Sequence, residues 1–466
     1  MACRLTRVWL LALAACGPGR PSESADLSIT MPVACIPELP GVTYHCGEFV
    51  VPETRDSVGL AVGPRTITLR FVVLAATKEP RQPDPILYLT DRPGVTAFAG
   101  LLRLAQYMDE GSDRDIVVLE QRGAGYSTPA LGCPRAAEGD PAFAALRSCR
   151  DSLAGSGVDL GAYTTEQSVR DYGAFMSRLG AVRYNLYGQG FGASLALALV
   201  RERGAAIRAV VLDTPILPNE SGDGRTLAAL SRLLRRCRAD ADCGPRYPNA
   251  AAQFGALVEQ LGRQPAVVGV ERVTPDRFFS MVAGALTDQA KLGGIPAGLA
   301  AAARGDWTAA DPLLQRGADI PEGVEMARLT STGQALSFLC PGAPDSAAAD
   351  TLGWPPPVVR LVEARARLRI GQCAVWSVPK RVERRSQPAA PDLPILVAVG
   401  EGDSTGAAAI VSTWPNATVM TAPATGDGSI SQSCPRRVMR AFFAAPLSQP
   451  DRSCVNRMLP IRFSGH

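Results

Sequence analysis

The residues whose types and spacing could support chemistry lie in one stretch, YNLYGQGFGASLALALV, at residues 184–200. An apolar run leads into a glycine-rich turn, and a helical pattern follows the turn. Two chemistries use this shape. The segment GQGFGA, residues 188–193, fits the G-x-G-x-x-G/A loop that holds the pyrophosphate of a dinucleotide. It also fits a G-x-S-x-G turn that presents a nucleophilic serine, except that the serine position is Gly190.

Dinucleotide binding has some support in the surrounding sequence. Ala193 occupies the third small-residue position, and Asp213 ends the next predicted strand, about where a ribose-binding carboxylate belongs. However, several predicted strands precede this loop, whereas such a fingerprint normally opens its domain. An exported chain also meets little free nicotinamide cofactor. Dinucleotide binding therefore remains a remote alternative, and we expect no cofactor.

The amino terminus predicts export. Arg4 and Arg7 precede an apolar run over 8–15 that is too short to cross a bilayer as a helix. The run ends in Leu-Ala-Ala-Cys, which resembles the lipobox of bacterial lipoproteins, with Cys16 as the residue that carries the lipid. Ordinary cleavage after the small residues Ala12 and Ala14 is the alternative. We expect residues 1–16 to be an export signal and the mature chain to lie on the periplasmic or cell-surface side, anchored to a membrane through its lipid.

The remaining cysteines agree with export. An even number of cysteines in an oxidising compartment favours disulfides over metal ligands. No C-x-x-C lies near an H-x-x-x-H, so we expect no metal site. Pairing of sequence neighbours is the simplest of many possible connectivities. These neighbouring couples are Cys35 with Cys46, Cys133 with Cys149, Cys237 with Cys243, Cys340 with Cys373, and Cys434 with Cys454.

Length and charge limit the classes of function. The chain has 466 residues, enough for one large domain with an insertion or for two modest domains. Its formal net charge is only +4, from 48 Lys and Arg against 44 Asp and Glu. No basic block is interleaved with aromatic residues, so we do not expect nucleic-acid binding.

Apolar patterning predicts an α/β fold, with a mainly parallel central sheet, helices on both faces and a helical cap insertion. Residues 17–30 are polar and rich in Pro, Gly and Ser, as in a flexible tether. Residues 31–215 alternate apolar runs with helical segments and form the first part of the core. Residues 216–385 are helical and rich in Arg and Ala, so we predict the cap there. The sheet pattern resumes in the second part of the core, residues 386–466.

Individual elements can be predicted within these segments. Thr164 and Gln167 have the spacing of a capping box, which begins a helix that ends at Gly180. A last helix is predicted over 434–446. Short apolar or alternating runs predict strands within residues 65–76, 85–90, 115–120, 183–188, 207–213, 393–403 and 417–429.

The whole pattern resembles a known family. The segments PILYLTDRPGVTA, DIVVLEQRGAGYSTPALGCP and LPILVAVGEGDS, with the stretch around Gly190, are similar to the exported proline iminopeptidases and tripeptidyl aminopeptidases of the α/β-hydrolases. The resemblance covers about Cys35 to Cys454, with a weak match in the insertion. It implies the α/β-hydrolase fold. In that family, a Ser, Asp, His triad in this chain order removes N-terminal residues from peptides.

The resemblance implies a degenerate catalytic triad. The serine falls on Gly190, which has no side chain to form an acyl-enzyme. The acid falls on Asp403, which keeps the required type. The histidine falls on Asp427, which cannot accept a proton from an alcohol as imidazole does. The only two histidines, His45 and His466, are poorly placed to replace it.

The oxyanion loop is altered as well. The family's Gly-Gly-Pro-Gly segment reads Asp91-Arg92-Pro93-Gly94, so a carboxylate replaces a residue that should favour developing negative charge. Loss of triad members in a serine hydrolase costs on the order of 10⁶ in kcat. We therefore predict a pseudoenzyme that binds a peptide, a small ligand or a protein partner without turnover.

Two alternatives stay open. An active serine-type hydrolase would need another nucleophile, with a carboxylate, a tyrosine or a lysine as its base. Asp91, Asp403 and Asp427 could instead form a carboxylate cluster that binds an amino group or Ca²⁺, unless Arg92 neutralises it. The Glu-Gln-Arg segment 120–122 is expected to hold loops in place.

Overall fold

The computed structural model describes eleven parts of the chain. Cys16, Asp403, Asp427, His466 and the predicted export signal lie outside these parts. The described residues are 27–35, 39, 41–133, 143–217, 222–314, 326–342, 351–379, 390, 392–400, 405–423 and 429–463.

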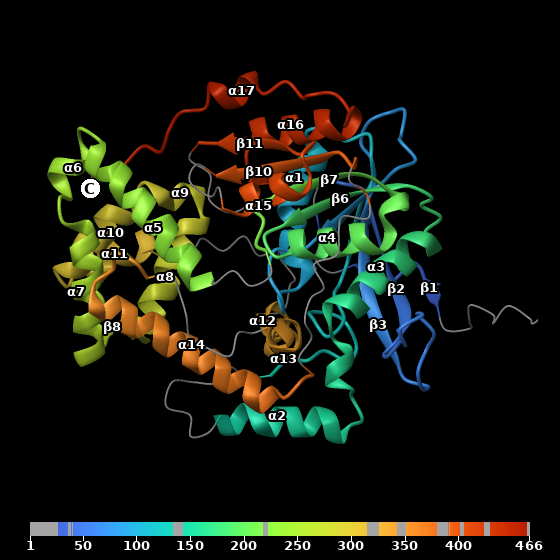
Figure 1. The fold of residues 1–466 in the computed structure, drawn as a ribbon, viewed down its shortest axis with the longest axis horizontal. Helices are drawn as coiled ribbons and strands as arrows, with labels where there is room; N and C mark the ends of the chain where they lie inside the picture. The colour runs from blue at the N-terminus through green and yellow to red at the C-terminus, as the bar shows by residue number, and fades with distance from the viewer. Residues whose placement is uncertain are drawn as a thin grey trace, which may run out of the picture.

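A mixed β-sheet forms the centre of the structure (Figure 1). Over the described residues it has nine strands. Six of them, β4, β5, β6, β7, β10 and β11, pair with one another in parallel. The first three pair antiparallel, and β3 is also antiparallel to β5. Across the sheet the strands are β1 (Ser28–Thr30), β2 (Tyr44–Pro52), β3 (Thr66–Leu74), β5 (Ile116–Leu119), β4 (Ile86–Leu89), β6 (Tyr184–Gln189), β7 (Ile207–Asp213), β10 (Ile395–Gly400) and β11 (Thr418–Ala422).

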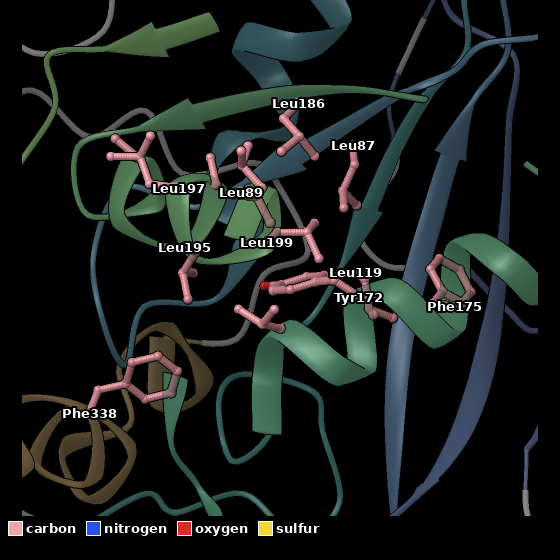
Figure 2. Close-up of a cluster of buried hydrophobic side chains, with 14 of the residues drawn as sticks. Leu87, Leu89, Leu119, Tyr172, Phe175, Leu186, Leu195, Leu197, Leu199 and Phe338 are labelled. Atoms are coloured by element: carbon pink, nitrogen blue, oxygen red, sulfur yellow. The ribbon is translucent and has the colours of Figure 1, made fainter. Parts of the chain in front are cut away.

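Helices cover both faces of this sheet. Successive side chains of a buried strand point to opposite faces, so Leu87 and Leu89 join one hydrophobic cluster while Ile86 and Tyr88 join the other. Figure 2 shows the first cluster, in which Phe175 packs beside the strands. Its helices are α2 (Ala144–Gly155), α3 (Thr165–Arg178), α4 (Gly192–Arg203) and α15 (Thr405–Thr413). The opposite face carries α1 (Leu101–Asp109), α16 (Ser433–Ala444) and α17 (Ser453–Asn456).

The insertion has a hydrophobic cluster of its own, on the side of the molecule away from β1 (Figure 1). A small hairpin of β8 (Ala266–Val268) and β9 (Glu271–Val273) lies within it. Its helices are α5 (Gly222–Ala239), α6 (Cys243–Arg246), α7 (Ala250–Arg263), α8 (Pro275–Thr287), α9 (Gln289–Leu292), α10 (Ile295–Ala303) and α11 (Trp307–Leu314).

The last part of the insertion connects the hydrophobic cluster of the insertion to the core around the central sheet. Helix α14 (Pro356–Trp376) places Val358 and Val362 in the cap cluster, but Val375 and Trp376 in the core cluster. Helix α12 (Met326–Leu329) leads into α13 (Thr332–Leu339), which also packs on the core. The insertion is therefore not one uniform cap.

The structure confirms most predicted elements and the sequential cysteine pairing. All five predicted couples form disulfides, which are typical of an exported protein. The hydroxyl of Thr164 accepts the N–H of Gln167, as a helix cap should. Strands β1 and β2 are not predicted from the sequence, and residues 28–30 belong to the sheet instead of the tether. Among the described residues, no helix is long and apolar enough to cross a membrane.

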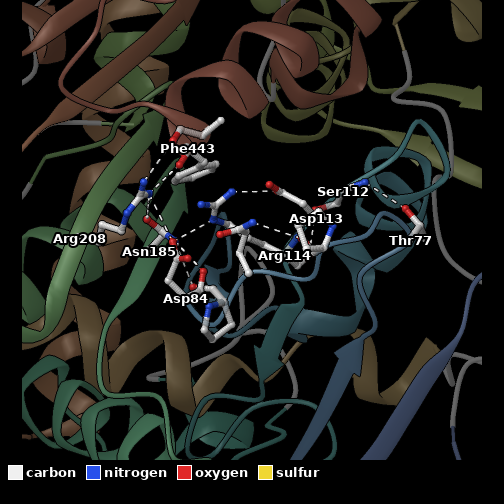
Figure 3. A network of polar contacts seen from close by, with 12 residues as sticks. Thr77, Asp84, Ser112, Asp113, Arg114, Asn185, Arg208 and Phe443 are labelled. Atoms are coloured by element: carbon white, nitrogen blue, oxygen red, sulfur yellow. Dashed lines mark hydrogen bonds and ion pairs between the residues drawn. The ribbon is translucent and has the colours of Figure 1, made fainter.

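A polar network ties the amino-terminal ends of the parallel strands together (Figure 3). The carboxylate of Asp84 accepts Arg114 Nε at 2.9 Å and Asn185 Nδ2 at 2.8 Å. Arg208 donates to the carbonyl oxygen of Phe443 at the end of α16 at 2.6 Å. Burial disfavours the charged carboxylate, but hydrogen bonds from Arg114 and Asn185 outweigh burial and lower the pKa of Asp84. This edge of the sheet is therefore fixed by structural charges.

Arg122 holds loops together at the opposite edge of the sheet, beyond the carboxyl end of β5. Its fully buried guanidinium donates to both carboxylate oxygens of Asp171, at 2.7 and 2.8 Å. It also donates to the carbonyl oxygens of Glu53 and Ala162. Arg55 adds a second ion pair to Asp171 at 2.7 Å. Arg122 therefore has the structural role that the sequence predicts.

Replacing Arg122 by glutamine is expected to lower the free energy of unfolding by about 3 kcal/mol, because it leaves part of a buried carboxylate uncompensated. The matched control is Arg367→Gln, which removes an exposed arginine paired with Glu363 on α14. The control is expected to change stability by no more than about 0.5 kcal/mol. Urea unfolding with the disulfides intact measures both values. Equal losses in the two variants would contradict this role of Arg122.

Candidate functional site

The turn between β6 and α4 has the shape of a nucleophile turn. Gly190 has a left-handed φ of +54°. Its N–H donates to the carbonyl of Asp213 at 2.8 Å, and its own carbonyl accepts the N–H of Ile216 at 3.0 Å. A Cβ on Gly192 would lie 2.2 Å from the carbonyl oxygen of Leu89, so the chain requires glycine at this close approach. The backbone of a G-x-S-x-G turn is therefore kept, while the reactive hydroxyl is missing.

A main-chain carbonyl occupies the space beside this turn. The N–H of Phe191 donates to the carbonyl oxygen of Asp91 at 2.9 Å. In a working serine hydrolase, the N–H of the residue after the nucleophile stabilises the oxyanion. A Cβ on Gly190 would lie 2.7 Å from the same Asp91 oxygen, closer than real Cβ atoms come to their neighbours. The observed loop and a side chain at position 190 therefore exclude each other.

The side chain of Asp91 is not what fills the oxyanion position. The sequence places a carboxylate there, whereas the structure places the main-chain oxygen of the same residue. The carboxylate of Asp91 lies 3.5 Å from Nε of Arg92, which is exposed. Of the three aspartates in the predicted carboxylate cluster, only Asp91 is described. The described residues contain no group of acidic, histidine or cysteine side chains that could bind a metal ion.

The insertion holds the Asp91 loop from its other side. The N–H of Ser331 donates to the carbonyl of Gly94 at 2.6 Å, and the N–H of Thr96 donates to the carbonyl of Leu329 at 3.1 Å. Val95 and Thr330, which lie between these two hydrogen bonds, form an antiparallel β-bridge. Ser331 lies directly before α13, so this helix is joined to the loop by main-chain bonds. The loop is fixed between the turn and the insertion.

Side chains of α13 reinforce this contact. The rings of Phe191 and Phe338 meet edge to face with centroids 5.6 Å apart, and Figure 2 shows Phe338 on α13, on the side of α4 that carries Leu195. Nε2 of Gln334 donates to Oε1 of Gln121 at 2.8 Å. Phe338 and Gln334 cannot be predicted as part of this site from the sequence, because neither residue belongs to a recognisable motif.

The carboxylate of Asp213 accepts several hydrogen bonds from groups inside the protein. It accepts the hydroxyl of Tyr187 at 2.6 Å, the hydroxyl of Ser429 at 2.8 Å and the N–H groups of Ser429 and Ile430. Burial raises the pKa of Tyr187 well above its ordinary value, so this phenol remains a donor. Asp213 exposes no surface and cannot bind a ribose. This role replaces the one expected for dinucleotide binding.

Alcohols near the turn lack the setting of a nucleophile. The hydroxyl of Ser194, four residues after Gly190, is buried and donates to the carbonyl of Ile216 at 2.7 Å. The hydroxyl of Ser429 does contact a carboxylate, that of Asp213, but this serine is fully buried. A substrate carbonyl cannot reach a hydroxyl that is sealed from solvent.

The described alternatives to a catalytic histidine are also poorly placed. Burial raises the pKa values of Tyr88 and Tyr187 above that of an ordinary phenol, so neither accepts a proton at neutral pH. His45 pairs with Val73 across β2 and β3, at the edge of the sheet where β5 begins. Gly190 lies beyond the opposite end of the parallel strands. Lys291 lies in the insertion and donates to the carbonyl of Pro312.

Glu120 positions the loops beside the candidate site. Its fully buried carboxylate accepts the hydroxyl of Thr96 at 2.6 Å, the N–H of Ala97 at 2.7 Å and the N–H of Tyr126 at 3.4 Å. Burial raises the pKa of Glu120 to about 7, even though the hydrogen bonds favour its charged form. Glu120 is thus a structural group that titrates near neutral pH.

One cavity in the described part of the chain lies away from the turn. Its volume is about 460 Å³, and it lies between the insertion and the segment after α17. None of its lining residues belongs to the turn or to the Asp91 loop. They are Gln289, Ala290, Gly293, Gly294, Pro423, Met458, Leu459, Pro460, Ile461 and Arg462.

Gly190→Ala is expected to lower the free energy of unfolding by roughly 3 kcal/mol, because it adds left-handed strain and forces Cβ against the Asp91 carbonyl. Gly180→Ala is the matched control, since Gly180 has φ +77° with open space around its Cβ position. The control isolates the backbone strain, about 1 to 2 kcal/mol. Urea unfolding measures both. If the two variants lose the same stability, the Asp91 carbonyl does not restrict position 190.

Glu120→Gln is expected to reduce the pH dependence of stability between about pH 4.5 and pH 7. The pKa of Glu120 is about 7 in the folded chain against an ordinary value of 4.5, so the folded state binds more protons in this window. The free energy of unfolding therefore falls as the pH rises, by at most about 1.4 kcal/mol per pH unit from this group. Urea unfolding of parent and variant across this window measures the difference. An unchanged slope in the variant would exclude Glu120 as its source.

Two family models match the sequence. The model described as the alpha/beta hydrolase fold matches residues 97–268, and the model described as TAP-like protein matches residues 360–454. No curated protein matches the chain.

Several solved structures resemble this chain at low sequence identity. A proline iminopeptidase from Mycobacterium smegmatis is 16% identical, with 82% of this chain and 95% of that chain covered and a TM-score of 0.37. A thermophilic esterase from Thermogutta terrifontis is 14% identical, with 83% and 97% covered and a TM-score of 0.38. An alpha/beta hydrolase from Novosphingobium aromaticivorans is 14% identical, with 86% and 96% covered and a TM-score of 0.36. Similarity at this level does not define an activity.

The architecture and the sequence match point to the same fold. The chain has a mainly parallel sheet covered by helices, and a glycine turn joins β6 to α4. The first family model spans this turn. The predicted fold class is therefore confirmed, and this chain has the α/β-hydrolase fold.

Proposed function

We propose that this chain is an exported pseudoenzyme that binds a peptide, a small ligand or a protein partner without hydrolysing it. The observation that carries this proposal is the hydrogen bond from the Phe191 N–H to the Asp91 carbonyl oxygen. This bond uses a donor that an oxyanion would need, and the same oxygen excludes a side chain at position 190. The catalytic centre is closed by the protein's own backbone.

The size of the expected effects supports a lack of turnover. Removing a nucleophile of this kind costs on the order of 10⁶ in kcat. Losing one oxyanion donor costs about 10² to 10³ by itself. In the sequence, Asp427 also stands where the resemblance implies histidine. Three components of one reaction are therefore changed, and no described side chain replaces them.

The class of ligand is proposed from the relatives. The carboxyl-terminal part matches the model for TAP-like proteins, and the sequence resembles exported peptidases. A site inherited from such proteins would recognise short peptides. Because acyl transfer is absent, a bound peptide would be released unchanged.

We also propose a membrane anchor for this protein. Five disulfides indicate folding in an oxidising compartment. The apolar run over 8–15 and the following Cys16 have the sequence of a lipoprotein signal. Lipidation of Cys16 would keep the folded chain at a membrane surface.

The purified chain is expected to hydrolyse p-nitrophenyl esters and aminoacyl amides no faster than its heat-denatured form. A fluorophosphonate probe is expected to leave it unlabelled, because the hydroxyls of Ser194 and Ser429 near the turn are buried and bonded inside the protein. Short peptides at ten times their Kd are expected to stabilise the fold by about 1.4 kcal/mol in a thermal shift assay. NAD is expected to cause no shift.

The control variant for this test is Ser194→Ala, which removes the buried hydroxyl four residues after Gly190. Hydrolysis by the parent that disappears in this variant would show an active enzyme with a different nucleophile. Stoichiometric labelling by fluorophosphonate would have the same meaning. Either result would overturn the proposal of a pseudoenzyme.

A further inference from the structure

The tip of the hairpin between β2 and β3 carries an unusual set of exposed side chains. Residues 57–64, SVGLAVGP, contain no charged residue. Val58, Leu60 and Val62 are 77%, 41% and 53% exposed. Turns of this kind are usually built from polar residues and glycine. Single exposed apolar residues are ordinary, but three on one short uncharged loop make it a candidate interaction site.

The base of this tip is held by polar contacts, so its aliphatic side chains are not needed to shape it. The carboxylate of Asp56 accepts the N–H groups of Val58 and Leu60 at 3.0 and 2.9 Å. Arg170 on α3 donates to the carbonyl of Ser57 at 3.2 Å. A Cβ on Gly59 would meet no atom within 4 Å, so the tip projects into open space.

The tip lies at the same end of the sheet as the amino-terminal entry of the described chain. Ser28 of β1 pairs with Val50 of β2, near the end of β2 that leads into the tip. Figure 1 shows β1 beside β2 on the side away from the α5–α11 helices. Leu27 packs against the core. The 11 residues from Cys16 to Leu27 span at most roughly 40 Å, so a lipid at Cys16 would hold the membrane within that distance of Leu27, at the end of the sheet that carries the tip.

We propose that the 57–64 tip docks on a lipid bilayer and inserts Val58, Leu60 and Val62 into its interface. Aliphatic side chains on an uncharged loop gain free energy by leaving water for this region. Arg65 follows the tip and is 43% exposed, but its Nε donates to the buried carboxylate of Glu53 at 3.0 Å, so this guanidinium belongs to an ion pair at the base of the tip. The proposal uses the proposed anchor only for proximity, and its test does not require lipidation.

This docking would orient the candidate site as well. Phe71 of β3 pairs with Leu119, the last residue of β5. Because β3 is antiparallel to β5, its start at Thr66 and the tip before it lie beyond the carboxyl ends of the parallel strands. Gly190 follows β6 at that same edge. The bilayer would therefore lie at the same edge of the sheet as the candidate site.

The test compares two variants of the full chain, each with three surface substitutions and with Cys16→Ser to remove the proposed lipid acceptor. Any contribution from the apolar run over 8–15 is then the same in both. The tip variant replaces three exposed aliphatic residues by serine, and the control variant replaces three exposed valines distant in sequence from the tip. The tip variant is Val58→Ser, Leu60→Ser and Val62→Ser, and the control variant is Val182→Ser, Val267→Ser and Val270→Ser.

Cosedimentation with vesicles of phosphatidylcholine and phosphatidylglycerol measures the partition coefficient of each variant. The tip variant is expected to partition at least tenfold less than the control variant. Equal partitioning would overturn the proposal. Unchanged partitioning together with loss of a dimer in sedimentation velocity would assign the tip to a second copy of the chain, which also overturns it.

A fluorescence measurement gives a second, independent readout. Leu60→Trp and Val182→Trp each place one additional indole on the surface of the full chain. Brominated lipid chains quench only an indole that enters the bilayer. Added quenching is expected for Trp at position 60 and not at position 182. Equal quenching at the two positions would show that the tip does not insert, whatever the outcome of the hydrolysis assays.

Discussion

One hydrogen bond between backbone groups decides what the candidate site can do. The Phe191 N–H is directed at the Asp91 carbonyl instead of a reaction intermediate. The bond forms because Gly190 has no Cβ, and its presence makes a Cβ unacceptable. The lack of a side chain at position 190 and the bonding of the Phe191 N–H are therefore one structural feature. A turn that had only lost a hydroxyl would keep this N–H free, whereas here it is bonded to Asp91.

Buried charges keep the scaffold around this contact in place. Arg122 with Asp171 and Arg114 with Asp84 fix loops at opposite edges of the sheet. Glu120 holds the loop that follows the Asp91 segment, and Asp213 holds the residues at Ser429. None of these groups faces a substrate. These groups form a polar framework around the turn, and in the described part of the chain position 190 carries no side chain.

The sequence predicts those parts of the structure that correspond to a recognisable pattern of residue types. Apolar runs locate β3 to β7, β10 and β11, and cysteine neighbours correctly suggest all five disulfides. The absence of serine at Gly190 is visible without coordinates. The Asp91 contact is not, because carbonyl oxygens are present at every residue. The packing of α13 on the core was missed for a similar reason, since its apolar residues look like those of the other helices in the insertion.

The joining of α13 to the Asp91 loop has an evolutionary consequence. A single codon change that restored serine at position 190 would meet a carbonyl that Phe191 holds on one side, in a loop that the Ser331–Gly94 bond holds on the other. The loop would have to shift first, but that shift brings no benefit until the serine exists. Reversion thus depends on a coupled change of loop and side chain, so the proposed loss of chemistry would act as a ratchet. Under this proposal, the fold is free to specialise in recognition.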